Sequence, residues 1–267
     1  MTQGQANPVF LKVLLRSAAR VVSLVLLAYV GACLFLYLQQ RSLLYFPAAT
    51  HVAVQDTNFA LRNGGVVLRG WVLNPGQSRA LLYFGGNGEA LGADGKELAT
   101  FFPRRTIYLL AYRGYGASGG EPSEQALFAD ALALFDHVHS QHASVAVVGR
   151  SLGSGVATYL ASQRPVERMA LVTPFDSLAN VAKAHYSMFP VDRLLKDRYE
   201  STRYVRQYSG PILVLRAGRD NVVPSADTDR LLASMQKTPL MVTFPSASHN
   251  SISDDPGYAA ALSEFMK

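Results

Sequence analysis

The sequence predicts an α/β fold in which helices cover both faces of a mostly parallel sheet. Apolar, β-branched runs alternate with stretches of helical periodicity along most of the 267-residue chain. Glycine-rich or polar loops follow several of these runs, and such loops gather at the carboxyl edge of a parallel sheet. An uncharged apolar segment precedes this pattern. We therefore expect a short tail and an anchor at residues 1–41, and one domain at residues 42–267.

The apolar segment predicts a transmembrane helix. Residues 21–38 carry no charge, and the whole stretch has about the 20 residues that a bilayer-spanning helix requires. Three basic residues precede it: Lys12, Arg16 and Arg20. Because only Arg41 closely follows it, the positive-inside rule places the N-terminus in the cytoplasm and the domain on the other side of the membrane. In a Gram-negative bacterium that side is the periplasm.

Three alternatives exist for this segment: a cleaved signal peptide, a lipoprotein signal that ends at Cys33, and a buried helix of the domain. The apolar run is longer than the 7 to 15 residues of a signal-peptide core. Residues 34–38 continue it beyond Cys33, so cleavage there would leave an apolar stump. A retained anchor is favoured. Cys33 is the single cysteine, which excludes an intrachain disulfide.

Composition and motifs give no sign of nucleic-acid binding or of a cofactor. The net charge is +6, but residues 1–55 contain four basic and no acidic residues, which leaves about +2 for the domain. No metal site is expected, because the chain has no H-E-x-x-H or C-x-x-C motif. His137, His139 and His142 have a spacing that suits one metal poorly, and their place near a helix end suits the helix dipole.

The predicted elements follow one another in a regular order. Strand-like runs near residues 57–61 and 66–73 meet at residues 62–65, whose Asn-Gly-Gly sequence indicates a hairpin. Further strands are expected at residues 80–84, 106–111, 169–173, 212–217 and 240–244, and in the run before Gly149. Helices are expected near residues 90–101, at residues 123–139 and after Ser151. Residues 174–210 are an aromatic-rich excursion at the position of a cap insertion, whose aromatic side chains either line an acyl pocket or bury the cap.

The most informative motif is G-x-S-x-G at residues 149–153, between a β-branched run and a helix-forming stretch. It is typical of a nucleophile elbow, a sharp strand-to-helix turn that exposes a serine hydroxyl. We expect the flanking glycines to adopt backbone angles that a side chain would forbid. Ser151 is the candidate nucleophile.

A serine nucleophile needs a base and an acid, which follow it in the order Ser, Asp or Glu, His. Asp220 lies in a turn directly after the strand at residues 212–217, and His249 lies in the loop after the strand at residues 240–244. We therefore expect Asp220 to be the acid and His249 the general base. Asp176 is the serious rival acid, since it follows the strand at residues 169–173; otherwise it is a helix-capping or loop residue.

Acyl transfer also needs backbone N–H donors for the oxyanion. The first donor is the backbone N–H of Leu152, the residue directly after Ser151. The second donor should come from the glycine-rich turn after residues 80–84, where Asn87 is our choice. The loop at residues 112–120 lies on the same edge, and its glycines favour a constrained turn, with Arg113 in a structural role.

The sequence resembles the α/β-hydrolases. More narrowly, it resembles the small membrane-anchored serine hydrolases of the serine-aminopeptidase-like and acyl-protein-thioesterase-like group. The matching segments are residues 40–47, 86–88, 112–120, 149–153 and 220–224, and His249. The resemblance implies an α/β-hydrolase fold with a small cap. One departure is Gly85, where the family usually has the histidine of His-Gly-Asn.

We therefore expect a serine hydrolase that cleaves esters or thioesters, acting on hydrophobic acyl groups through a covalent acyl-enzyme. The substrate would be a small molecule, a lipid or an acylated protein; no cofactor, metal or nucleic acid is expected, and no oligomeric state is predicted. Two alternatives differ in class: a serine aminopeptidase, for which no acidic cluster plainly supplies an ammonium site, and a catalytically silent binding scaffold.

Overall fold

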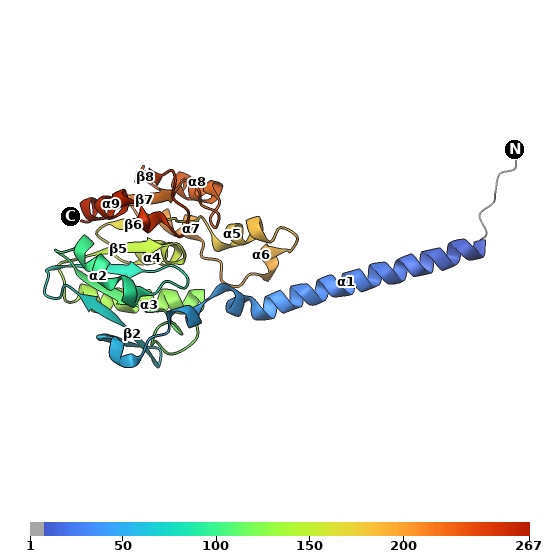
Figure 1. Cartoon of the computed structure of the whole chain (residues 1–267), viewed down its shortest axis with the longest axis horizontal. Helices are drawn as coiled ribbons and strands as arrows, with labels where there is room; N and C mark the ends of the chain where they lie inside the picture. Colours follow the sequence, from blue (N-terminus) through green and yellow to red (C-terminus); the bar gives the residue numbers. More distant parts are fainter. Residues whose placement is uncertain (1–7) are drawn as a thin grey trace. The chain divides into compact units, whose positions relative to one another are not determined.

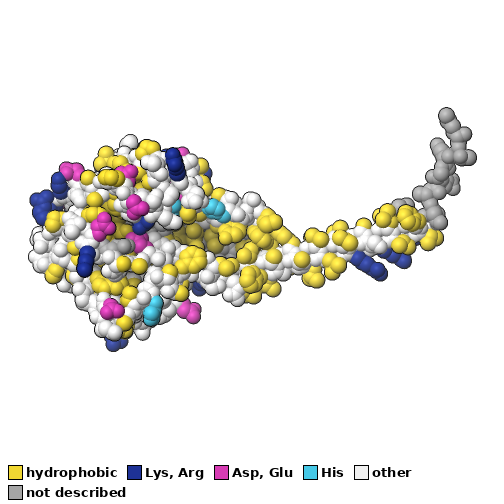
Figure 2. All heavy atoms as spheres, viewed as in Figure 1, with side chains coloured by type: hydrophobic (Ala, Val, Ile, Leu, Met, Phe, Trp, Pro, Cys, Tyr) yellow, Lys and Arg dark blue, Asp and Glu magenta, His cyan; other side chains and the backbone are white. Residues whose placement is uncertain are grey.

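The computed structural model describes residues 8–267, which divide into two compact units between Gln40 and Arg41. Helix α1 (Pro8–Leu44) provides the described part of the first unit and enters the second (Figure 1). On the face seen in Figure 2, hydrophobic side chains lie along this helix, and Lys and Arg side chains lie toward its N-terminal end. Its apolar stretch has a mean hydropathy of 2.5 and is not buried. By length and composition, α1 can cross a membrane.

The second unit contains an eight-stranded sheet in the order β1-β2-β4-β3-β5-β6-β7-β8. The strands are β1 (Phe59–Asn63), β2 (Val66–Leu73), β3 (Arg79–Phe84), β4 (Thr106–Leu110), β5 (Ser144–Arg150), β6 (Met169–Val172), β7 (Ile212–Ala217) and β8 (Leu240–Phe244). Strand β2 pairs antiparallel with β1 and β4, and all other pairs are parallel. The mostly parallel sheet predicted from the sequence is confirmed.

Helices pack on both faces of the sheet because its central strands are apolar on both sides. In β3, Leu82 and Phe84 face the core that contains α3 (Glu124–His139) and α4 (Leu152–Gln163). Leu81 and Tyr83 face the opposite core, which contains α2 (Leu91–Phe101) and α9 (Pro256–Phe265). This arrangement confirms the predicted two-sided cover and leaves the loops at the strand ends free to form a site.

Residues 174–210 connect β6 to β7 through three short helices: α5 (Leu178–His185), α6 (Val191–Leu194) and α7 (Ser201–Val205). Helix α8 (Ser225–Ala233) follows β7. Phe175, Tyr199 and Tyr208 are buried in the same core as α3 and α4. The sequence left two roles open for the aromatic side chains of this segment: lining an acyl pocket or burying the cap. These three side chains have the second role, because they pack the segment against the domain.

Candidate active site

Ser151 occupies the sharp turn between β5 and α4. Its backbone has φ 48° and ψ −114°, a left-handed conformation that is rare for a residue with a side chain. The strain is held by hydrogen bonds: the Ser151 amide donates to the Val172 carbonyl at 2.9 Å, and the Ser154 amide donates to the Ser151 carbonyl at 2.9 Å. The predicted strand-to-helix turn is therefore present, with the serine itself at the strained position.

The expectation that the flanking glycines adopt forbidden backbone angles is wrong. Neither Gly149 nor Gly153 has a positive φ; they are needed because no side chain would fit. A Cβ on Gly153 would lie 2.0 Å from the Phe84 carbonyl oxygen, and one on Gly149 would lie 2.4 Å from the Gly153 carbonyl oxygen. The two glycines let α4 approach the ends of β3 and β5 closely.

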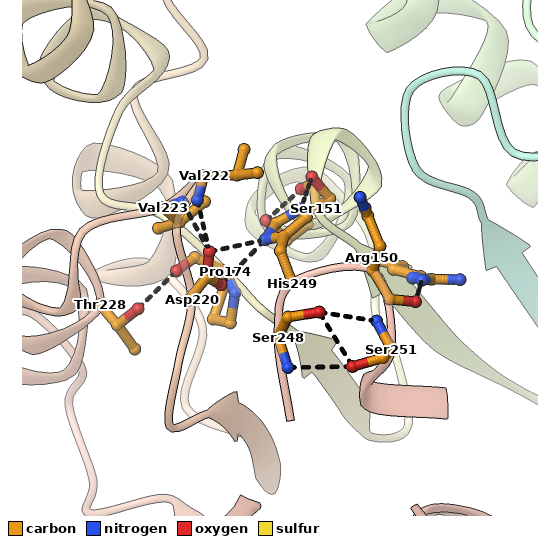
Figure 3. A network of polar contacts seen from close by, with 12 residues as sticks. Arg150, Ser151, Pro174, Asp220, Val222, Val223, Thr228, Ser248, His249 and Ser251 are labelled. Carbon is orange, nitrogen blue, oxygen red and sulfur yellow. Dashed lines mark hydrogen bonds and ion pairs between the residues drawn. The ribbon is translucent and has the colours of Figure 1, made fainter. Parts of the chain in front are cut away.

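Ser151, His249 and Asp220 form a continuous hydrogen-bonded chain (Figure 3). The Ser151 Oγ lies 2.8 Å from His249 Nε2, and His249 Nδ1 lies 2.8 Å from Asp220 Oδ2. His249 is only 5% exposed although its loop lies at the sheet edge. An Nδ1–H that donates to Asp220 leaves the Nε2 lone pair directed at the serine hydroxyl. The three residues predicted from three separate loops are thus brought together.

Backbone amides fix the Asp220 carboxylate in the turn after β7. Its Oδ1 accepts hydrogen bonds from the amides of Val222 at 2.9 Å and Val223 at 2.8 Å. The side chain is 10% exposed. Two backbone donors and one imidazole hold this carboxylate in one orientation, so it can stabilise a developing imidazolium.

Asp176, the rival acid, has other partners. Its Oδ1 accepts from the Ser177 amide at 2.6 Å, and its Oδ2 accepts from Asn180 at 2.6 Å and from Arg230 Nε at 2.5 Å. These contacts join the start of α5 to α8. Its carboxylate is thus engaged in a structural cluster, whereas that of Asp220 contacts His249.

The loop after β3 holds Asn87 firmly by its side chain. The Asn87 Oδ1 accepts from Tyr115 Oη at 2.6 Å and from the Phe46 amide at 3.1 Å, and its Nδ2 donates to the Leu44 carbonyl. Burial raises the pKa of Tyr115 to about 12, so its hydroxyl remains a donor. Neither the Asn87 amide nor the Leu152 amide donates a hydrogen bond within residues 8–267. Both remain available to an oxyanion.

Sequence reasoning did not identify Glu89, which lies beneath this loop. Its carboxylate accepts from the Gly86 amide at 2.5 Å and from Tyr83 Oη at 2.7 Å. It also lies near Arg150, the residue before the nucleophile. The only sequence signal was its place directly after Gly88, in a loop already assigned to the site.

The other residues considered earlier have structural partners. Arg113 contacts Asp130 of α3 through two hydrogen bonds of 2.6 and 2.8 Å, which agrees with its expected structural role. The ring of His142 contacts Tyr108 Oη at 3.0 Å and the Gln77 carbonyl at 2.9 Å. Among residues 8–267, no group of three or more His, Cys, Asp or Glu side chains is arranged to hold a metal ion.

Known proteins resemble this chain along most of its length. The chain is 36% identical over 249 residues to the uncharacterized protein Rv2307c of Mycobacterium tuberculosis, which covers 87% of this chain and 88% of that protein. It is 32% identical over 167 residues to the lysophosphatidylserine lipase ABHD12 of Macaca fascicularis, covering 54% of this chain and 42% of the lipase. No protein-family model matches the chain.

Solved structures share the fold at low sequence identity. Est1E of Butyrivibrio proteoclasticus, solved with ferulic acid, aligns with a TM-score of 0.63 and 15% identity over 78% of this chain and 98% of its own. The Pyrococcus furiosus esterase Pf2001 aligns with a TM-score of 0.63 and 15% identity over 81% of this chain and 95% of its own. The fold and these relatives together show that the chain belongs to the α/β-hydrolase superfamily.

Proposed function

We propose that the protein is a membrane-anchored serine hydrolase that cleaves esters or thioesters of hydrophobic acyl groups. The observation that carries this proposal is the hydrogen-bonded chain from Ser151 Oγ through His249 to Asp220, with contacts of 2.8 Å on each side of the imidazole. A hydroxyl within hydrogen-bond reach of a base, itself oriented by a carboxylate, is an activated nucleophile. The same triad would also serve a serine peptidase, so the preference for esters rests on the relatives: one is named a lysophosphatidylserine lipase, and a solved structure with this fold is named an esterase. A silent scaffold would not require the hydrogen-bonded triad.

The reaction proceeds through a covalent acyl-enzyme. His249 Nε2 removes the hydroxyl proton as Ser151 Oγ attacks the acyl carbonyl carbon, and the carbonyl π electrons move to its oxygen. The tetrahedral intermediate collapses, the bond to the leaving group breaks, and the protonated His249 gives its proton to the departing alcohol or thiol. Water then attacks the acyl-Ser151 ester with His249 as base, which releases the carboxylic acid and regenerates the hydroxyl.

Two backbone amides stabilise the negative oxygen of each tetrahedral intermediate. The Leu152 amide stands at the start of α4, where the helix dipole also favours an anion. The Asn87 amide comes from the loop after β3. Removal of one such donor typically raises the barrier by about 3 kcal/mol, so the two together supply a large part of the rate enhancement.

The substrate class is a hydrophobic acyl compound at a membrane surface. Helix α1 is apolar over a length that can span a bilayer, and the hydrolase unit begins at Arg41, in the last turn of this helix. One relative over about half of this chain is named a lysophosphatidylserine lipase. Both observations favour lipids over soluble esters, with acylated membrane proteins as the second group to test.

The proposed organisation is a cytoplasmic tail and anchor at residues 1–41, and a hydrolase domain at residues 42–267 with a cap at residues 174–210. The excess of Lys and Arg before the span favours a location of this domain on the non-cytoplasmic side, by the positive-inside rule. Fusion of alkaline phosphatase or green fluorescent protein to the C-terminus tests the orientation. The proposal predicts an active phosphatase and a dark fluorescent protein; the opposite pattern contradicts it.

Turnover measurements on three substrate series test the function. The series are p-nitrophenyl esters, acyl thioesters and aminoacyl amides, each of increasing chain length, with the full chain in detergent micelles. We expect turnover of the first two series that rises with acyl length and is lost in Ser151→Ala. Ser162→Ala is the matched control, because Ser162 lies at the far end of α4 and its hydroxyl bonds only locally: it donates to the Tyr159 carbonyl at 2.7 Å and accepts from Gln163 Nε2 at 3.0 Å. A preference for aminoacyl amides, or turnover by Ser151→Ala, refutes the proposal.

A further inference from the structure

A charged pair that the mechanism above does not use lies directly behind the site. The Glu89 side chain is 9% exposed and that of Arg150 is 16% exposed, and Arg150 Nη1 lies 3.7 Å from Glu89 Oε1. Burial of two charges is costly unless hydrogen bonds compensate it, and apolar side chains would often be at least as stable. Stability alone is therefore a weak explanation for this pair, and its hydrogen bonds indicate what else it does.

Glu89 holds both polar groups of Gly86. The Glu89 carboxylate accepts from the Gly86 amide at 2.5 Å, and the Glu89 amide donates to the Gly86 carbonyl at 3.2 Å. The Gly86 carbonyl and the Asn87 N–H belong to one planar trans peptide, in which they point in opposite directions. Fixing the Gly86 carbonyl therefore fixes the direction of the Asn87 N–H, the proposed oxyanion donor.

Gly86 is close to the nucleophile. A Cβ built on Gly86 would lie 3.7 Å from Ser151 Cβ and 3.9 Å from the Arg150 carbonyl oxygen. The peptide that Glu89 holds is thus in contact distance of the elbow. A small rotation of this peptide changes the distance between the Asn87 amide and a carbonyl bound at Ser151.

Arg150 extends the same set of contacts to the third loop. It directly precedes Ser151, and its Nη2 donates to the Asn250 carbonyl at 3.2 Å. Asn250 directly follows His249. One guanidinium therefore connects the oxyanion loop, through Glu89, with the loop that carries the base.

The space at Gly85 agrees with this role. A Cβ on Gly85 would meet Leu91 Cδ2 at 2.7 Å and Glu89 Oε2 at 3.3 Å, and the Gly85 carbonyl accepts from Tyr112 Oη at 2.8 Å. The carboxylate of Glu89 thus occupies the space toward which a side chain at position 85 would point. In this chain, Glu89 supports the oxyanion loop from a position three residues beyond Gly86.

We propose that Glu89 and Arg150 are positioning residues that hold the oxyanion loop, the elbow and the histidine loop in one arrangement. This inference rests on the proposed serine hydrolase function. It concerns the transition state more than substrate binding, because the Asn87 amide meets its partner only when negative charge develops on the carbonyl oxygen.

Four variants test the inference: Glu89→Gln, Glu89→Ala, Arg150→Met and the control Asp136→Asn. Asp136 of α3 also pairs with an arginine, Arg164, which directly follows α4, but this pair lies on the solvent-exposed surface. We expect kcat on the best ester to fall about 100-fold in Glu89→Ala and about 10-fold in Glu89→Gln, with KM within about threefold. Glu89→Gln keeps an oxygen acceptor for the Gly86 amide but loses the charge that faces Arg150. Asp136→Asn should leave both constants unchanged.

The double variant Glu89→Gln with Arg150→Met adds an independent criterion. If the two residues hold the same arrangement, its loss of kcat is smaller than the product of the two single losses. Thermal unfolding curves show which variants are folded. If Glu89→Ala is unfolded, the kcat values of Glu89→Gln and Arg150→Met test the inference.

The inference is overturned if the folded Glu89 variants keep kcat within twofold of the parent, if only KM changes, or if the losses multiply. Failure of the parent to turn over any ester would instead refute the proposed function.

Discussion

Replacement of Gly153 by alanine tests whether the elbow depends on the close approach of α4 to β3. The added Cβ would lie 2.0 Å from the Phe84 carbonyl oxygen and 2.7 Å from the Gly85 carbonyl oxygen. Both atoms are backbone, so no side-chain rotation relieves the clash. Phe84 and Gly85 also lie at the start of the loop that carries Asn87.

The size of the effect follows from these distances. To reach about 3.0 Å, the shortest separation tolerated, the first turn of α4 and the end of β3 must move apart by about 1 Å. Overpacking of this kind costs about 1–3 kcal/mol of unfolding free energy, and a misplacement of about 1 Å at a catalytic group costs about 100-fold in rate. We therefore expect Gly153→Ala to lose about 3 kcal/mol of unfolding free energy and about 100-fold in turnover.

The assay compares Gly153→Ala with Gly95→Ala in urea unfolding and in ester turnover. Gly95 is also helical, in α2, but a Cβ there would meet only side chains, the nearest at 3.6 Å. Gly95→Ala should keep full activity and gain about 0.5–1 kcal/mol from helix propensity. Wild-type activity and stability in Gly153→Ala would show that the close approach does not shape the site.

Two further predictions concern carboxylates. Asp220→Asn should lower kcat about 10³- to 10⁴-fold, because an amide does not hold the histidine in the required tautomer. Asp176→Asn should instead lower the unfolding free energy by about 1–3 kcal/mol and leave kcat within about twofold. The reverse pattern would show that Asp176 is the catalytic acid. Burial alone would raise the pKa of Glu167, but hydrogen bonds from Arg105 and Ser144 outweigh it and lower the pKa to about 2, against an ordinary value of 4.5. The Glu167 carboxylate therefore stabilises the fold above pH 4.5 and loses this contribution as the pH falls toward 2, so the stability difference between the parent and Glu167→Gln, measured by urea unfolding, should shrink over that interval. A constant difference would contradict this.

The fold was predictable because it depends on local patterns. Apolar runs such as those of β3 and β7 could be recognised from composition, and the residues after them fall at one edge of the sheet by the geometry of parallel strands. For this reason Ser151, Asp220 and His249, separated by up to 98 residues, could be selected before any distance was known.

The parts that the sequence did not predict depend on distances between elements. The roles of Gly149 and Gly153 appear only when α4 is placed against β3, since the positive φ belongs to Ser151. The role of Glu89 depends on contacts with Tyr83, Gly86 and Arg150 in three different segments. No spacing rule connects these positions.

The central claim is that Ser151 forms the covalent acyl-enzyme. The most direct measurement is mass spectrometry of the full chain after reaction with a fluorophosphonate, which esterifies activated serines. The proposed mechanism predicts one adduct, on the peptide that contains Ser151, in the parent and in Ser162→Ala, and none in Ser151→Ala. Equal labelling of Ser151→Ala, or an adduct on a different serine, would contradict it.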